Sequence, residues 1–175
     1  MQLKKTLYIT LIILLTALTI HFVTIFMLPK YIGWRNINTQ MNDYGVNLIE
    51  HIDINSERIR KINFSPDNLY SICAYDVSEK PLHFSALIPR SYWSIAFYSD
   101  NNQNFMTIDN NLGITSLELV LFGPETPPSN ISNSVVATSP TSQGLIIVRI
   151  FVQRDDQLNE LIKIRETMVC REYKN

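Results

Sequence analysis

One stretch of 22 residues, from Leu7 to Leu28, carries no charged side chain and constrains the fold more than any other feature. At 1.5 Å per residue, a helix of this length measures roughly 33 Å, enough to cross a hydrocarbon core of about 30 Å. All 16 acidic side chains and 13 of the 15 basic ones follow this stretch. This distribution excludes a purely soluble protein, a transporter with several spans and a disordered tail. It predicts one transmembrane helix over residues 7–28, followed by 147 residues that can form one ordinary domain.

The short segment before the apolar stretch, residues 1–6, contains Lys4 and Lys5. A basic N-terminal flank favours the cytoplasmic side of a membrane. We therefore expect a single-pass protein of the bacterial inner membrane, with a cytoplasmic N-terminus and a periplasmic domain. A cleaved signal peptide is the alternative, but its apolar centre normally spans about 7 to 15 residues and ends in a small-residue site. Ala17-Leu18-Thr19 resembles such a site poorly and has more apolar sequence after it, so an uncleaved anchor is favoured.

The part beyond the apolar stretch contains 13 basic and 16 acidic side chains, a formal charge of −3. A nucleic-acid surface would need a clustered basic face, so we expect no nucleic acid among the partners. The expected partners are the membrane itself and an envelope protein. We expect no cofactor and no metal. Asp100, Asn102 and Asn104 share the opening of a calcium loop, but Phe105 stands where that loop requires glycine.

The two cysteines, Cys73 and Cys170, both lie in the external part. An oxidising compartment would allow them to form a disulfide. Closing a loop of about 97 residues contributes roughly 4 to 5 kcal/mol in the chain-entropy model. Two buried free thiols are the alternative, because cysteine is often buried without a partner.

The apolar period changes to two at Leu69, as is typical of strands with one buried face. Before this point, residues 29–64 are expected to be a connector with a short helix, and Pro29 marks the exit from the membrane. Residues 65–175 are expected to form the β-rich domain, closed by a helix that begins at Asp155 or Asp156 and keeps helical spacing as far as Val169. The predicted strands are 69–77, 82–88, 92–99, 104–109, 115–122, 135–138 and 145–152. The pattern predicts a mainly β fold, a β-sandwich or barrel-like domain of six to seven strands with a C-terminal helix.

Arg149 is the most informative single residue, because it stands in the middle of an otherwise apolar strand. A guanidinium in such a place is costly unless it is paired and hydrogen-bonded. A structural ion pair with an aspartate at a strand edge, Asp67, Asp76 or Asp109, is one interpretation. An anion-binding pocket is the other, and nearby aromatic side chains could line it. The candidate ligand-binding residues are Arg149, Asp67, Asp76, Tyr70 and Trp93.

For nucleophilic catalysis the chain offers His51 and His83 together with several serines, including Ser71. No G-x-S-x-G elbow is present, and neither histidine has the spacing of a zinc site. We therefore assign no catalytic residue.

Several short motifs occur in a fixed order between residues 47 and 170. They are Ser65–Ser78 followed by Pro81, Tyr92-Trp93-Ser94, Asp100 with Asn104-Phe105, Gly123-Pro124, and Ser139-Pro140 leading into Gly144–Arg149. In this combination the chain resembles the 1254 family of domains of unknown function, and most of all its short, membrane-anchored bacterial members. The resemblance implies a mainly β fold and no established activity. Where the family has a longer Pro-Asn-x-Asp-Thr-x-Tyr pattern, this chain has Pro66-Asp67-Asn68-Leu69-Tyr70, so a function tied to the longer pattern is not carried over.

Two functions of different classes follow from these observations, and a structural role in assembling a partner complex is a third interpretation, which an exposed apolar patch would favour. The first is a membrane-anchored binding or interaction module in the cell envelope. The second is an envelope enzyme that acts on a small anionic or glycan substrate around Arg149. The solvent access of Arg149 distinguishes them, because an enzyme needs that guanidinium open to a pocket.

Overall fold

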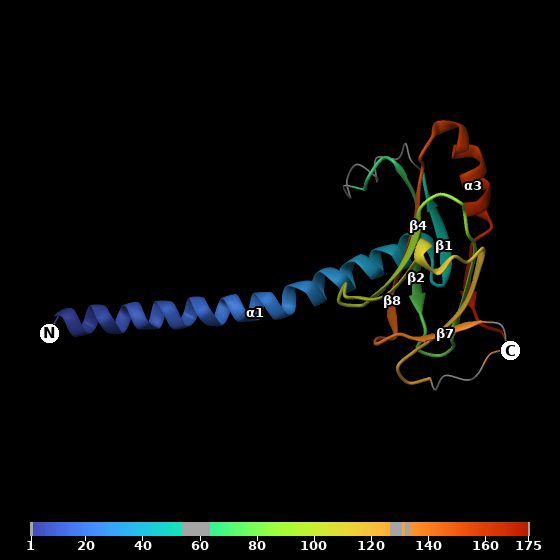
Figure 1. The fold of residues 1–175 in the computed structure, drawn as a ribbon. Coiled ribbons are helices and arrows are strands. Elements are labelled where there is room, and N and C mark those ends of the chain that lie inside the picture. The colour runs from blue at the N-terminus through green and yellow to red at the C-terminus, as the bar shows by residue number, and fades with distance from the viewer. Residues whose placement is uncertain (1, 54–63, 127–130, 132–133, 175) are drawn as a thin grey trace.

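The computed structural model describes residues 2–53, 64–126, 131 and 134–174. Figure 1 shows a long N-terminal helix that leads into a β-rich domain. The helices are α1 (Gln2–Tyr44) and α3 (Leu158–Glu166), with short 3-10 turns η1 (Asn110–Leu112) and η2 (Asp155–Gln157). The strands are β1 (Leu48–Ile52), β2 (Asn68–Asp76), β3 (Leu82–Leu87), β4 (Trp93–Ser99), β5 (Asn104–Asp109), β6 (Ser116–Phe122), β7 (Val135–Thr138), β8 (Gln143–Phe151) and β9 (Val169–Glu172).

The nine strands of the described residues form two sheets. Sheet A has the order β1-β2-β8-β4-β5, and sheet B has the order β7-β6-β3-β9. Every pair of neighbours is antiparallel except β6 and β7. Alternate residues of both sheets face each other and form the main core, which includes Tyr75, Phe84, Phe97, Leu119 and Ile146, all fully buried. The domain is therefore a β-sandwich, in which two apolar sheet faces pack together.

A second, smaller apolar cluster lies on the outer face of sheet A, the face turned away from sheet B. It joins Ile37 of α1 to apolar side chains of β1, β2 and β8, among them Ile72 and Leu145. Both faces of the two central strands β2 and β8 are thus covered, which explains why their sequences are apolar almost throughout.

The second half of α1 packs on the sandwich through residues spaced four apart, Gly33, Ile37 and Met41, which fall on one face of a helix. Gly33 lies so close to the β4–β5 turn that a Cβ atom there would be 2.1 Å from the backbone oxygen of Asp100. Ile37 is 1% exposed. The first half of α1 is long and apolar enough to cross a membrane, a property that signal sequences share. One continuous helix therefore joins the apolar segment to the domain.

The predicted disulfide is confirmed: Cys73 and Cys170 are bonded, with their Cα atoms 6.5 Å apart. Cys73 lies on β2 in sheet A and Cys170 on β9 in sheet B. The bond therefore ties the two sheets together across the main core, where both residues are buried.

The mainly β fold is confirmed, and each of the seven predicted strands is present as β2 to β8. Two strands, β1 and β9, were not predicted. β1 lies within the predicted connector, and β9 lies where helical spacing was expected to continue to Val169. There the chain leaves the helix after Glu166, because residues 169–172 pair with β3 and place Cys170 opposite Cys73. The structure also carries α1 through Pro29 to Tyr44, where a short separate helix was expected. Residues 54–63 of the predicted connector lie outside the described residues.

Candidate functional site

A groove of about 470 Å³ runs between α1 and the outer face of sheet A. We call it the α1 groove. It is larger than the hollows beside His83, about 200 Å³, and beside Asp76, about 220 Å³. Its lining residues are Tyr31, Ile32, Arg35, Asn36, Thr39, Gln40, Phe64, Ile72, Asn102, Leu145 and Ile147. Its volume lies within the range of about 300 to 1,000 Å³ that is usual for small-molecule sites.

The floor of the α1 groove is apolar because it is formed by the two central strands of sheet A. Ile72 of β2 lies directly opposite Ile147 of β8, and Leu145 is two residues along on the same face. Ile72 and Leu145 are nearly buried, at 6% and 8% exposure, whereas Ile147 is half-buried. Side chains two residues apart on a strand point to the same side, so these branched residues form one continuous surface.

One wall of the α1 groove is the flank of α1 beside its packing face. Gly33 and Ile37 hold the helix against the sheet, and this leaves Ile32, Arg35 and Thr39 at the border of the groove, exposed to solvent. The packing face and the groove wall are therefore parts of one helix, and the wall cannot move without breaking the packing.

Phe64, which lines the α1 groove, belongs to an aromatic pair. Phe64 stacks on Tyr70 with ring centroids 4.1 Å apart and an interplanar angle of 15°. The Tyr70 hydroxyl accepts a hydrogen bond from the backbone N–H of Ser65 at 3.2 Å. Tyr70 itself is 4% exposed. The predicted ligand-binding residue Tyr70 thus supports the groove through Phe64, which lines it.

Among the described lining residues of the α1 groove, one side chain carries a formal charge. Arg35 is the only ionisable group other than Tyr31 among the described residues that line it, and no carboxylate is among them. The remaining polar groups are neutral amides and a hydroxyl, from Asn36, Asn102, Gln40 and Thr39. As far as the described residues go, the groove therefore combines an apolar floor with a polar rim that carries the positive charge of Arg35.

Arg149 lies on the same outer face of sheet A, one alternate position beyond Ile147. It is half-buried, directly opposite Tyr70 on one side and Ser94 on the other. No ion pair joins it to an aspartate within the described part of the chain. Neither Asp67, whose backbone oxygen accepts from Val152, nor any other predicted carboxylate partner is bonded to it there.

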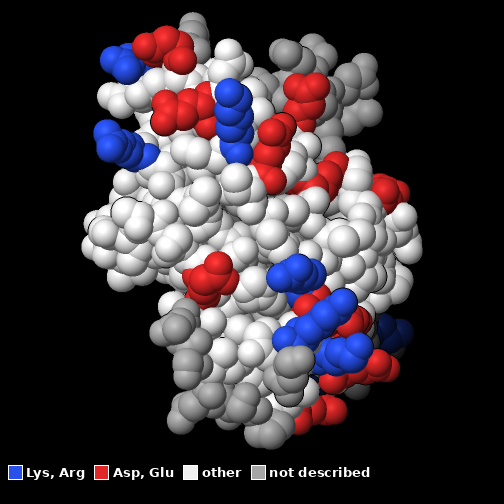
Figure 2. Space-filling view, turned by 90° about the vertical axis from the view of Figure 1, so that its right-hand side faces the viewer, with Lys and Arg blue, Asp and Glu red and all other residues white. Residues whose placement is uncertain are grey.

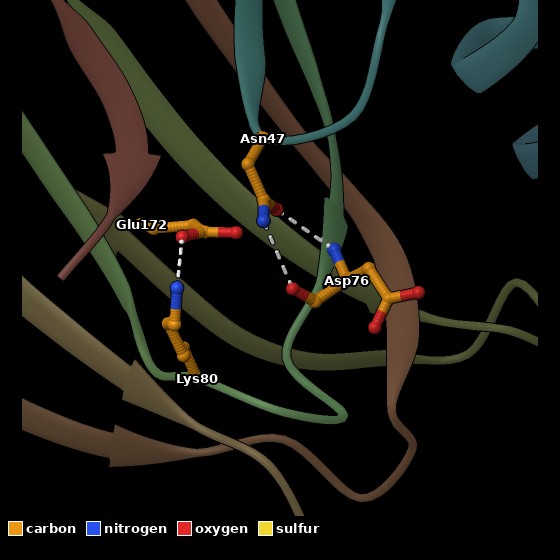
Figure 3. Close-up of polar contacts among 4 residues, drawn as sticks. All are labelled: Asn47, Asp76, Lys80 and Glu172. Carbon is orange, nitrogen blue, oxygen red and sulfur yellow. Dashed lines mark hydrogen bonds and ion pairs between the residues drawn. The ribbon is translucent and has the colours of Figure 1, made fainter.

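Asp76 lies at the other end of β2, opposite Gln143, six residues along β8 from Arg149. At about 3.4 Å per residue this separates the two by roughly 20 Å. Figure 3 shows Asn47 holding the backbone of Asp76 through two hydrogen bonds, of 3.0 and 2.8 Å. Beside it, Lys80 and Glu172 form an ion pair of 2.9 Å. The arrangement fastens the start of β1 to the end of β2.

The Asp76 carboxylate accepts hydrogen bonds from Gln143 and from the hydroxyl and backbone N–H of Ser78. Partial burial acts to raise its pKa, but these hydrogen bonds together hold the pKa below its usual value. Asp76 is therefore an ionised group that stabilises a turn, far from Arg149.

Trp93 points into the main core, where it is 2% exposed, because it lies opposite Ile150 on the inner face of β4. The structure therefore brings together only Arg149 and Tyr70 among the five predicted ligand-binding residues, with Asp67 immediately before the strand that carries Tyr70.

The structure also pairs two residues considered for nucleophilic catalysis. Nδ1 of His51 lies 2.8 Å from the hydroxyl oxygen of Ser71. Burial, and then the nearby Arg165, lower the pKa of His51, which favours the neutral ring. Ser71 is 1% exposed, so its hydroxyl is sealed from a substrate. A second pair, His83 and Glu118 at 2.6 Å, lies on the exposed face of sheet B.

Sequence reasoning missed the residues that α1 contributes to the groove, such as Arg35 and Thr39. The signal that could have found them is the four-residue spacing of Gly33, Ile37 and Met41, a narrow apolar stripe in an otherwise polar segment. A glycine on such a stripe indicates close packing of the helix on another backbone.

Comparisons with known proteins identify a family and a fold. The model of a family described as "Protein of unknown function (DUF1254)" matches residues 46–172. The crystal structure of the VPA0106 protein from Vibrio parahaemolyticus is similar at a TM-score of 0.71 and 11% identity, covering 86% of this chain and 37% of that one. An uncharacterized protein from Burkholderia cenocepacia matches at a TM-score of 0.48 and 11% identity, over 61% of this chain and 32% of that one. No curated protein matches. This chain thus spans little more than a third of the Vibrio protein, whose likeness shows the fold alone.

Proposed function

The chain belongs to the DUF1254 family of proteins of unknown function, and we propose that it is a single-pass membrane protein whose β-sandwich serves as a binding module in the cell envelope. In this proposal residues 1–6 are cytoplasmic, the first half of α1 spans the bacterial inner membrane, and the sandwich stands in the periplasm. The α1 groove is its binding site, and an envelope protein is a further possible partner of the exposed surface.

The observation that carries this proposal is the continuity of α1. The helix runs without interruption from the apolar stretch to Tyr44, and Gly33 and Ile37 fix its second half to sheet A. A signal peptide is removed from the protein that it directs, whereas this helix is a structural part of the domain. The continuity therefore supports an uncleaved anchor that holds the sandwich close to the membrane surface.

Two further features support the periplasmic side. Lys4 and Lys5 precede the apolar stretch, which favours a cytoplasmic N-terminus. The Cys73–Cys170 disulfide is of the kind that persists in oxidising compartments such as the periplasm.

The surface of the sandwich away from α1 supports binding at the groove over binding to a polyanion. Figure 2 shows this face, where basic and acidic side chains lie in mixed groups around a broad uncharged middle. The fields of neighbouring charges of opposite sign largely cancel at a distance, and salt ions screen the remainder over about 8 Å. In the α1 groove, on the opposite side, the described residues present only positive charge beside an apolar floor.

An enzyme acting on a small anionic or glycan substrate is the weaker proposal. Its best residue, Arg149, is half-buried without an ion pair in the described residues, as an anion site would need. Asp76, however, lies about 20 Å away along the strand, so the predicted polar partners do not converge on Arg149.

Topology and anchoring can be tested with the full chain carrying one epitope tag at each end, expressed in a Gram-negative host. We expect both tags on one membrane-embedded protein that resists carbonate extraction. The C-terminal tag should be protected from protease in intact cells and digested in spheroplasts. A K4E/K5E variant is the matched control, and its fraction in this orientation should fall. A C-terminal tag that stays resistant until the membrane is lysed, or an N-terminal tag missing from the mature protein, would refute the proposal.

A further inference from the structure

We propose that the α1 groove binds one anionic phospholipid from the membrane leaflet at which α1 emerges. The phosphate lies beside Arg35, and the upper part of one acyl chain, drawn out of the leaflet, lies over Ile72, Leu145 and Ile147. This inference rests on the proposed membrane anchoring, and it names the ligand class of the same site.

The position of the groove along α1 brings it to the lipid headgroups. At 1.5 Å per residue, Tyr31 lies about 5 Å beyond Leu28 and Gln40 about 18 Å beyond it. The headgroup region adds roughly 5 to 8 Å to each side of the hydrocarbon core. The end of the groove at Tyr31 is therefore level with the headgroups when residues 7–28 span the core.

Aromatic side chains mark the same level of the helix. Tyr31 and Trp34 are each 58% exposed, with ring centroids 6.3 Å apart. Tyrosine and tryptophan are enriched at membrane interfaces, where their rings are apolar at one end and hydrogen-bonded at the other. Their exposure next to the groove is accounted for by contact with headgroups, which places the groove mouth in the interface.

The chemistry of the groove matches an anionic amphiphile. The guanidinium of Arg35 presents a planar fork of donors that suits a phosphate, and no carboxylate among the described lining residues competes for it. No described residue covers the apolar floor at Ile147, which is half-buried. A lipid that places its phosphate at the rim and its acyl chain on the floor pairs with the Arg35 guanidinium and covers the apolar surface.

The size of the groove favours part of one lipid over a macromolecule. About 470 Å³ fits a small ligand, whereas a stable protein partner buries about 800 Å² on each side. The rigid wall given by Gly33 and Ile37 also fixes the groove width before a ligand arrives.

The test uses the full chain reconstituted in nanodiscs that contain phosphatidylglycerol and phosphatidylcholine, followed by native mass spectrometry. Lipids that remain bound after mild release are counted. We expect one retained phosphatidylglycerol per chain. R35Q should weaken retention at least about tenfold, as loss of a charge-assisted contact does. T39W, which fills the groove from the exposed side of α1, should abolish retention.

Matched controls separate this site from general effects. R90Q removes an exposed arginine elsewhere on the domain, and N42W adds the same bulk at an exposed position of α1 that does not line the groove. Both should retain the lipid as the unmodified chain does. Because Thr39 and Asn42 are exposed, neither tryptophan enters the core, and circular dichroism should show the same folded domain.

Three outcomes would overturn the inference. One is the absence of a retained lipid in the unmodified chain, and another is equal retention in T39W. The third is displacement of the lipid by inorganic phosphate at millimolar concentration, which would indicate a phosphate site. Flotation of the chain with liposomes is measured first, because a chain that does not float contradicts the membrane anchoring, whereas a chain that floats without a specific lipid contradicts only the lipid site.

Discussion

Replacing Gly33 by alanine tests whether α1 is part of the domain. The substitution should raise the stability of a free helix and lower the stability of a helix docked on the domain. In an exposed helix, alanine is more favourable than glycine by about 1 kcal/mol. In the docked helix, the new methyl carbon would lie 2.1 Å from the backbone oxygen of Asp100, whereas ordinary contact begins at 3.4 Å. The helix would therefore have to move away from the turn by more than 1 Å.

The magnitude follows from the contacts that this movement loosens. Ile37, one turn further along the same face, is 1% exposed, and burial of such a side chain contributes about 1.5 to 3 kcal/mol. Subtracting the helix-propensity gain of about 1 kcal/mol leaves a net destabilisation of about 0.5 to 2 kcal/mol. For a domain of this size that lowers Tm by about 1 to 8 °C.

Thermal unfolding of the full chain in a non-ionic detergent, followed by circular dichroism, measures this change. Hydrogen exchange of residues 99–102 locates it, because Gly33 packs on the turn between β4 and β5. Asn42→Ala is the matched control, since Asn42 is exposed on the same helix, and its Tm should equal or slightly exceed that of the unmodified chain. A G33A protein as stable as the unmodified chain, with unchanged protection of the turn, would show that α1 is not packed there.

Two further predictions concern the sandwich itself. Replacing both Cys73 and Cys170 by alanine should cost about 4 to 5 kcal/mol in urea unfolding, because the bond closes a sequence separation of 97 residues; an unchanged urea midpoint would contradict this. Burial raises the pKa of Tyr75 from 10 to about 12, so between these pH values the unfolded chain releases a proton that the folded chain retains. The stabilisation linked to Tyr75 should therefore be fully present below pH 10. The free energy of unfolding should then fall by up to roughly 3 kcal/mol as pH approaches 12. Tyr75→Phe should show a smaller fall over this interval in pH-dependent urea unfolding, and an identical fall would exclude Tyr75 as its source.

The sandwich could be predicted because its cause is local. A strand with one buried face repeats every two residues, and this period is visible in β2 to β8 whatever their partners are. β1 and β9 are four or five residues long and depend on distant partners. β1 begins after Asn47, whose left-handed backbone (φ 56°) and hydrogen bonds to Asp76 set its register. β9 depends on β3 and on the disulfide. Neither dependence leaves a period in the sequence.

The candidate site could be predicted only in part, for a related reason. Arg149 and Tyr70 stand out in sequence because each breaks or shapes an apolar strand, and they do share the outer face of sheet A. Trp93 was placed among them by residue type, but its position opposite Ile150 turns it inward. A sequence shows which residues alternate, whereas the choice of face depends on register, which one residue of slip reverses.

The groove is formed by two segments of different character. Its floor belongs to strands that fold in water, and its wall belongs to a helix whose first half has the composition of a membrane span. Ile37 and Met41 cover part of the same apolar face of sheet A that the groove leaves open. A chain cut before β1 would keep the sandwich and lose both the cover and the wall, exposing Ile72 and Leu145 together. Helix α1 therefore completes the surface on which binding is proposed.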